Sequence, residues 1–229
     1  VQAVQSLERI EALYARQRTQ LGNTLRGLLA EFGIVLPKGP GHLACRLPEL
    51  MASPAFAAVP AALHEALAEL FDQFLAAGER LAEAKRRLVR AAGRDPRARL
   101  LVSVPGIGPL VAAGFLAAVG EATRFDSGRG LAVWLGLTPK LYQSGERCYL
   151  LGISKRGNER LRSLLVVGAQ SMLRRYAEGR YPGDPLAEWA RALLNRKPRN
   201  VAAVALANKI ARIAWRVAVS GQPYRPRHA

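Results

Sequence analysis

Side chains that bind metals or form disulfides are scarce in this chain of 229 residues. Its two cysteines are far apart and lack Cys-x-x-Cys spacing, so neither a disulfide framework nor a cysteine-ligated metal site is expected. Its three histidines form no ligand pair at helical spacing, so no metal site is predicted in this chain. Both thiols should be reduced, as in a cytosolic protein. The residues concerned are Cys45, Cys148, His42, His64 and His228.

Long apolar runs and aromatic residues are also few. The longest apolar stretch, residues 111–119, is interrupted by Gly114 and is too short to cross a bilayer, so no membrane partner is expected. The first residues lack the pattern of a signal peptide, and we predict a cytoplasmic location. Aromatics make up 7% of the chain, whereas alanine, leucine and arginine dominate, a composition that favours helices over a sandwich or barrel.

Acidic residues are outnumbered two to one by basic residues. The chain has 34 Lys and Arg against 17 Asp and Glu, a net charge of +17. Such a field predicts a polyanionic partner, because basic side chains on DNA or RNA release condensed counterions. Residues 1–140 hold 17 basic and 12 acidic groups, whereas residues 141–229 hold 17 and 5, so the contact should centre on the C-terminal part. A ribosome-like binder or a merely basic surface would carry the same charge.

The apolar periodicity predicts a mainly α protein with two regions. In residues 1–95 we expect a long coiled-coil helical hairpin, with a first helix that ends near Gly33 and a Pro- and Gly-rich connector over residues 34–60. The second helix has apolar residues at alternating steps of four and three over positions 63–88. This heptad seam can pair with a second copy, giving a homo-oligomer, or pack on the first helix of the same chain. In residues 96–229 we expect a helical domain with one small β-hairpin.

The first motif of the second region is a candidate helix-hairpin-helix at residues 101–113. Pro105, Gly106 and Gly108 form a Pro-Gly-Ile-Gly corner between an apolar helix end and an alanine-rich helix. Glycines allow a tight turn, and backbone N–H groups at the start of the next helix can face a phosphate oxygen. We predict that these three residues contact the DNA backbone. The alternative is an ordinary helix–helix corner whose glycines serve packing.

Two further segments hold the candidate site residues. Residues 140–150 alternate in polarity around a Ser-Gly pair and predict a short hairpin with Ser144 at its tip and Arg147 just after it. Residues 151–158 form a basic, glycine-flanked loop before a helix, where Lys155 and Arg156 are candidate phosphate clamps. The alternatives are a turn serine and a solvated basic face. Upstream, Asp126 or Ser127 should cap a short helix.

The order of these motifs resembles the C-terminal domain of insertion-sequence 110/116/902 family transposases. The motifs are Val-Pro-Gly-Ile-Gly-Pro-Leu, Gly-Glu-x-x-Arg-Phe, Trp-Leu-Gly-Leu-Thr-Pro, Ser-Gly and Gly-Ile-Ser-Lys-Arg-Gly-Asn, all within residues 104–158. Residues 25–33 resemble the start of the coiled-coil region of the same family, and residues 204–212 resemble its closing helix.

The resemblance implies a nucleoid-associated bacterial recombinase that transposes an insertion sequence. Family members pair an N-terminal RNase-H-like domain, whose acidic residues bind a divalent metal (Mg), with a C-terminal domain whose serine forms a phosphoserine bond to DNA. Ser144 matches that serine, and a guide RNA is a further partner of some members. This chain begins at the coiled-coil region, so the acidic domain, the metal and full activity are expected elsewhere. A non-catalytic helix-hairpin-helix DNA-binding module and an inactive transposase remnant are the alternatives.

Overall fold

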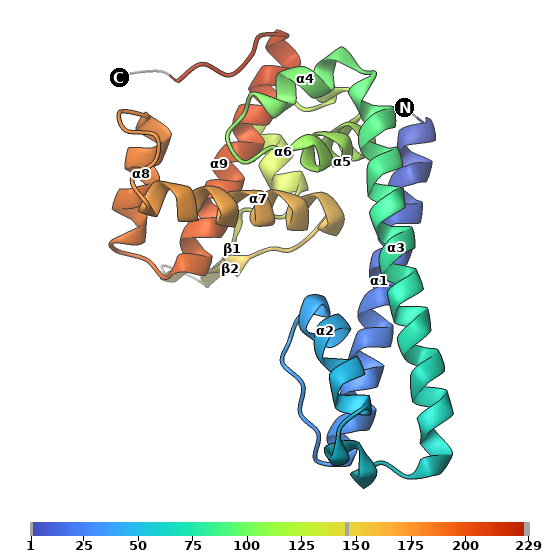
Figure 1. Ribbon diagram of the computed structural model, residues 1–229. Coiled ribbons are helices and arrows are strands. Elements are labelled where there is room, and N and C mark those ends of the chain that lie inside the picture. The colour runs from blue at the N-terminus through green and yellow to red at the C-terminus, as the bar shows by residue number, and fades with distance from the viewer. Residues whose placement is uncertain (1, 145–146, 227–229) are drawn as a thin grey trace. The chain divides into compact units, whose positions relative to one another are not determined.

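The computed structural model describes residues 2–144 and 147–226, and it confirms the mainly α fold (Figure 1). The chain divides into two compact units. The N-terminal unit is residues 7–87, and the C-terminal unit is residues 88–229 together with the first six residues. The sequence predicts a boundary near residue 95, after the second long helix, whereas the two units divide within that helix. No helix in the described ranges is both long and apolar enough to cross a membrane.

The N-terminal unit is built from two long helices that run antiparallel, and shorter helices form the connection between them in the chain (Figure 1). The first long helix ends two residues before Gly33, which takes a positive φ of 76°, the left-handed conformation that commonly follows a helix. Leu25, Leu29 and Phe74 are among the buried residues that join the helices into one apolar core. The elements are α1 (Gln2–Glu31), α2 (Pro40–Met51), η1 (Pro54–Ala58), η2 (Ala61–Leu63) and α3 (His64–Gly93).

The heptad seam of α3 is buried within a single chain. Phe74 and Leu81 are 1% and 7% exposed, and the Arg18 guanidinium of α1 lies 5.2 Å from the centre of the Phe74 ring. A Cβ on Gly22 of α1 would stand 3.1 Å from Cε2 of Phe74, so the two helices approach closely there. The seam therefore packs on α1 of the same chain, and its burial does not require a second copy.

The C-terminal unit is organised around α7 (Glu159–Ala177) and α9 (Arg199–Ser220). α9 packs against α7 and α6, and more lightly against α4 and α8, while α7 also contacts α5 and α8. The buried face of α9 is rich in alanine, whose small side chain lets neighbouring helices come close. The remaining elements are α4 (Pro96–Val102), α5 (Pro109–Val119), η3 (Ala122–Arg124), α6 (Gly128–Trp134), β1 (Pro139–Ser144), β2 (Arg147–Ile153) and α8 (Pro185–Leu194).

The predicted glycine-rich corner connects α4 to α5. Val104 and Ile107 are buried and anchor the corner in the core, while Pro105, Gly106 and Gly108 are partly exposed. Gly106 has a φ of 87°, and a Cβ there would meet Cδ1 of Ile210 at 2.8 Å. Gly106 thus serves the packing of its own unit, which agrees with the alternative of an ordinary helix–helix corner. Gly108 has an ordinary φ of −85° and open space around a built Cβ. Contact of this corner with DNA stays a prediction.

The two glycines give a matched test of this difference. We expect Gly106→Ser to lower the free energy of unfolding by on the order of 2–4 kcal/mol, from the left-handed backbone and the contact with Ile210. Gly108→Ser should change it by less than about 0.5 kcal/mol or raise it, because serine is a good cap at the start of α5. Urea unfolding of both variants measures the difference. Equal destabilisation would show that the close packing at Gly106 is unimportant.

Candidate nucleic-acid interface

The sequence-predicted hairpin is confirmed: β1 and β2 form a two-stranded antiparallel sheet. The register pairs Tyr142 with Tyr149 and Ser144 with Arg147, so Ser144 is the last residue of β1, next to the turn. Residues 145–146 and the side chains of Ser144 and Arg147 lie outside the described part of the structure. In the backbone register, Ser144 and Arg147 stand directly opposite each other across the strand pair.

Lys155 and Arg156 lie at the opposite end of the hairpin. Pro139, at the start of β1, pairs with Ile153, and the basic loop follows immediately. Five residue steps along β1 separate this base from Ser144, roughly 17 Å at the usual rise of a strand. Although Lys155 and Arg156 are close to Ser144 in the sequence, they therefore do not flank it within one chain. Both side chains are exposed, which leaves them able to contact a phosphate elsewhere on a bound nucleic acid.

The basic loop is locked to the segment before β1 by close backbone contacts. The Ser154 amide donates to the Thr138 carbonyl at 2.9 Å, and the Lys155 amide donates to the Gly136 carbonyl at 3.1 Å. Lys155 takes a φ of 56°, a conformation that costs a non-glycine residue about 1–2 kcal/mol. A Cβ on Gly157 would collide with the Trp134 carbonyl oxygen. The Trp-Leu-Gly-Leu-Thr-Pro and Ser-Lys-Arg-Gly-Asn motifs are thus two halves of one clamp.

Arg162 of α7 closes this clamp, and the sequence reasoning missed it. Its side chain is buried, and Nη1 donates to the Leu135 carbonyl at 3.0 Å and to the Arg156 carbonyl at 2.9 Å. A guanidinium supplies several donors in a fixed plane, so a single side chain can hold two loops at once. Arg162 lies three and seven positions before the buried Leu165 and Ala169, the spacing of one helix face, and this was the available signal.

Side chains from two other positions complete the base of the hairpin. Asn158 caps α7, because its side-chain oxygen accepts a hydrogen bond from the Leu161 amide at 2.8 Å. Asn208 of α9 donates to the Leu137 carbonyl at 3.1 Å. Of the two residues that the sequence offers as the cap of this helix, Asp126 or Ser127, it is Ser127 that caps α6, by accepting the Gly130 amide. The clamp is therefore anchored to both central helices, α7 and α9.

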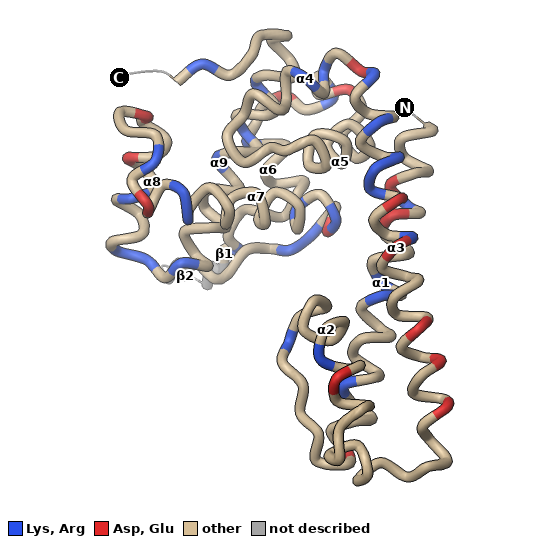
Figure 2. Tube along the Cα trace, viewed as in Figure 1, with Lys and Arg blue, Asp and Glu red and all other residues tan. Residues whose placement is uncertain are grey.

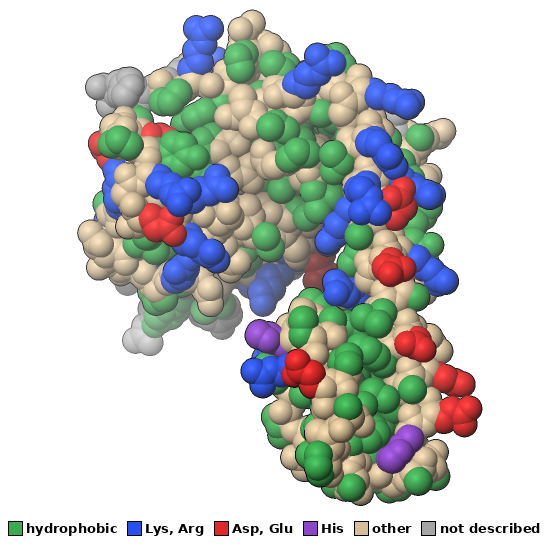
Figure 3. Space-filling view, in the orientation of Figure 1, with side chains coloured by type: hydrophobic (Ala, Val, Ile, Leu, Met, Phe, Trp, Pro, Cys, Tyr) green, Lys and Arg blue, Asp and Glu red, His purple; other side chains and the backbone are tan. Residues whose placement is uncertain are grey.

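Basic side chains outnumber acidic ones on the surface of the C-terminal unit. Figure 2 shows Lys and Arg recurring along the loop after β2 and along α7, α8 and α9. On the face shown in Figure 3 they gather over α7 and α8. Arg174, Arg175, Arg180 and Arg199 line a hollow of about 600 Å³ in this unit, and Arg180 pairs with Glu178 at 3.2 Å. The excess of positive charge is therefore largely available to an external polyanion.

A divalent metal finds no obvious ligands in the part of the chain that the structure describes. No three His, Cys, Asp or Glu side chains come together there in a way that could hold an ion. One of the acidic groups, Asp95, is instead engaged in local contacts. Asp95 caps α4 and pairs with Arg97 at 2.8 Å, and the hydrogen bond from Arg97 lowers the pKa of the Asp95 carboxyl below its usual value.

Residues 98–181 match the family model described as "Transposase IS116/IS110/IS902 family". The chain is 40% identical over 225 residues to the Pseudomonas aeruginosa protein named "Probable family 20 transposase", covering 98% of this chain and 66% of that protein. It is 36% identical over 224 residues to the transposase for insertion sequence element IS1111A of Coxiella burnetii, covering 98% and 60%. It is 35% identical over 220 residues to the transposase for insertion sequence element IS1328 of Yersinia enterocolitica, covering 96% and 64%. The chain thus spans between half and two thirds of the length of the first curated relatives it matches.

The clamp predicts a specific effect of removing the Arg162 guanidinium. Arg162→Met keeps much of the side-chain volume but leaves the Leu135 and Arg156 carbonyls without their donor. We expect the free energy of unfolding to fall by about 2–4 kcal/mol. Trypsin should also cleave after Lys155 and Arg156 faster, because their loop is no longer held. Arg174→Met, on an exposed position of the same helix, is the control and should change neither result. Similar behaviour of the two variants would argue against the clamp.

Proposed function

Since the chain belongs to the IS116/IS110/IS902 transposase family, we propose that it is the DNA-binding and strand-joining portion of a transposase that moves an insertion sequence. The observation that most directly supports this is the position of Ser144. It ends β1 at the tip of a hairpin whose base is clamped to both central helices, and Arg147 lies opposite. The backbone register alone therefore places Ser144 next to the turn that joins the two strands.

In the proposed reaction Ser144 is the nucleophile. Its Oγ attacks the phosphorus of a phosphodiester and loses its proton, the Oγ–P bond forms, and the bond to the leaving sugar oxygen breaks as that oxygen gains a proton. The phosphoserine link conserves the energy of the broken bond for rejoining. Negative charge grows on the phosphoryl oxygens during attack. We assign its neutralisation to Arg147, because the backbone register pairs this residue with Ser144 across the strand pair.

The proposed reaction needs a base for the serine hydroxyl, because serine is a weak nucleophile at neutral pH. The family resemblance implies Mg bound by acidic residues of another domain. The acidic residues described here form no cluster that fits such an ion, so we assign no step of the reaction to a metal held by them. The contribution of this chain is to present the serine, neutralise charge and bind the DNA backbone.

DNA binding without cleavage is the second candidate. The partly exposed corner with Gly108 and the exposed Lys155 and Arg156 favour it, because each could contact phosphates with no reaction at Ser144. This candidate and the first share their binding surface and differ only in whether a covalent adduct forms.

We expect salt-sensitive binding of duplex DNA, centred on residues 141–229. If four phosphates are neutralised, the binding constant should fall roughly a hundredfold between 50 and 200 mM salt. Fluorescence anisotropy of a labelled duplex measures this, and a structured RNA of the same length tests a guide-RNA partner in the same series. A binding constant that hardly changes over this range would exclude an interface built on phosphate contacts.

We expect Ser144→Ala to abolish the covalent protein–DNA adduct while leaving DNA binding intact, because the change removes a hydroxyl and no charge. The assay uses a chimera in which residues 88–229 replace the aligned segment of the full-length Pseudomonas aeruginosa relative, so that the rest of that protein is present. The unaltered chimera must first form the adduct on a denaturing gel. Ser154→Ala, at the base of the hairpin, is the control and should reduce the adduct only partly. An adduct that persists in Ser144→Ala and vanishes in Ser154→Ala would transfer the nucleophile role to Ser154.

A further inference from the structure

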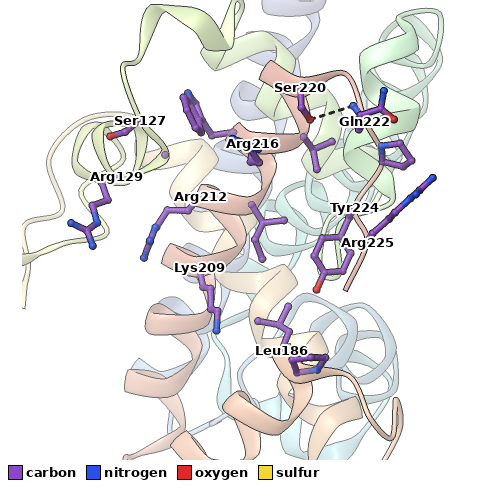
Figure 4. A pocket seen from close by; sticks show the side chains of 16 residues that line it. Ser127, Arg129, Leu186, Lys209, Arg212, Arg216, Ser220, Gln222, Tyr224 and Arg225 are labelled. Carbon is purple, nitrogen blue, oxygen red and sulfur yellow. Dashed lines mark hydrogen bonds between the residues drawn. The ribbon is translucent and has the colours of Figure 1, made fainter. Parts of the chain in front are cut away.

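The C-terminal unit has a second basic surface, which is formed by elements other than the β-hairpin. A hollow of about 950 Å³ is bordered by α9, the start of α6, the start of α8 and the tail that follows α9 (Figure 4). We call it the α9 groove. The side chains important here are Arg129, Lys209, Arg212, Arg216, Tyr224 and Arg225. Among the residues that the structure describes, none from the hairpin or the clamp lines it.

Close backbone contacts build the α9 groove and fix its walls. A Cβ on Gly128 would stand 3.0 Å from the Arg212 carbonyl oxygen, so the start of α6 packs directly on α9 and brings Arg129 to its edge. Gly221 ends α9 with a φ of 65°. The tail is then held by a hydrogen bond from the Tyr224 amide to the Ser103 hydroxyl at 2.8 Å. The fold therefore holds the walls of the groove in place, and α6, α9 and the tail each bring a basic side chain to it.

The charges that line the α9 groove are mostly unpaired. Arg129, Arg212, Arg216 and Arg225 are exposed, and within residues 2–144 and 147–226 none of them forms an ion pair. Burial lowers the pKa of Lys209, and the neighbouring Arg212 lowers it further, whereas Asp184 raises it. Asp184 caps α8 by accepting the Leu186 amide. A cleft lined by charges of one sign raises the local concentration of ions of the opposite sign.

The spacing of the charges on α9 suits a linear polyanion. Lys209, Arg212 and Arg216 follow one another at steps of three and four, so they share one side of the helix in a row about 10 Å long. Figure 4 shows these three side chains in order along α9, with Arg129 beside them from α6 and Arg225 from the tail. Duplex DNA carries about one negative charge per 1.7 Å of its axis, so several phosphates can lie along such a row.

The aromatic residues of the groove favour backbone contact over base stacking. The Trp215 indole N–H donates to the Ala122 and Phe125 carbonyls, at 3.0 and 3.2 Å, which ties that ring to its own unit. The Lys209 ammonium lies 4.2 Å from the centre of the Trp189 ring and covers its face. Tyr224 is half-buried. Single-stranded nucleic acid is commonly held by free aromatic faces on which bases stack, and the described lining residues do not offer such a platform.

We propose that the α9 groove binds the phosphate backbone of duplex DNA, as a contact separate from the strand presented to Ser144. The proposal rests on the proposed function, in that it names where the duplex lies on the C-terminal unit. Phosphate contacts of this kind fix the register of a duplex without reading its sequence. The groove would therefore hold the DNA flanking the reacting phosphodiester, while the hairpin tip reaches the bond to be broken.

The test compares two pairs of charge-removing substitutions in the full chain. The groove variant is Arg212→Gln with Arg216→Gln, and the control is Arg9→Gln with Arg16→Gln, which removes the same charge from exposed positions of α1. We expect the groove variant to bind a labelled duplex at least about tenfold more weakly at 100 mM salt. The slope of log K against log salt should become shallower by about 2, because two phosphate contacts are lost. The control should keep the slope of the unaltered chain.

The outcomes separate this proposal from the proposed function. If the unaltered chain shows no salt-dependent duplex binding, the proposed function fails. If it binds duplex and the groove and control variants weaken binding equally, the duplex lies elsewhere and the α9 groove proposal is overturned. It is also overturned if the groove variant keeps its affinity for duplex DNA and loses affinity only for single-stranded DNA, or only for polyglutamate added as a competitor. Unchanged circular dichroism and an unchanged unfolding midpoint in both variants confirm that the fold is retained.

Discussion

The hydrogen bonds of one buried guanidinium hold together the parts on which the candidate active site depends. Arg162 donates to carbonyls on two segments that are about twenty residues apart in the chain, those of Leu135 and Arg156. A buried charge without partners is strongly unfavourable, whereas a hydrogen bond to a charged group contributes about 1.5–3 kcal/mol. Arg162 therefore stabilises the structure only while both segments stay in place, and this makes the base of the hairpin a single cooperative element.

The two surfaces assigned to DNA share α9 as their support. Asn208 of α9 donates to the Leu137 carbonyl at the hairpin base, and the adjacent Lys209 begins the basic row of the α9 groove. A helix is stiff along its axis, so a duplex held along that row would be fixed relative to the base of the hairpin. The buried alanines of α9 make this possible, because their small side chains let neighbouring helices pack closely on the buried face of α9 while the row stays on the groove side. In the proposed function, positioning of Ser144 and binding of the duplex thus rest on the same packed helix.

The elements that local pattern governs were predictable. The long helices, the end of α1 near Gly33, the Ser127 cap and the hairpin with Ser144 at its tip follow from periodicity, capping and turn chemistry, which act within a few residues. Which partner would bury the heptad seam of α3 could not be predicted. A leucine at a seam position has the same sequence signature whether it packs on its own chain or on a second copy, and the burial of Phe74 beside Arg18 answers that within one chain.

The sequence by itself determined the helical character, the positive charge of the C-terminal part, the order of the family motifs and the candidacy of Ser144. Only the tertiary structure decided how those residues are grouped. It paired Arg147 with Ser144 and put Lys155 and Arg156 at the far end of the hairpin. An extended strand rises more than about 3 Å per residue, so residues that are close in sequence can lie far apart in space. It also turned Arg162 inward and aligned Arg212 and Arg216 with Arg129 from another helix. The physical reason is that segments far apart in the chain decide, by packing together, which side chains are buried and which come close to one another. The type of a single residue does not indicate which distant residues will contact it.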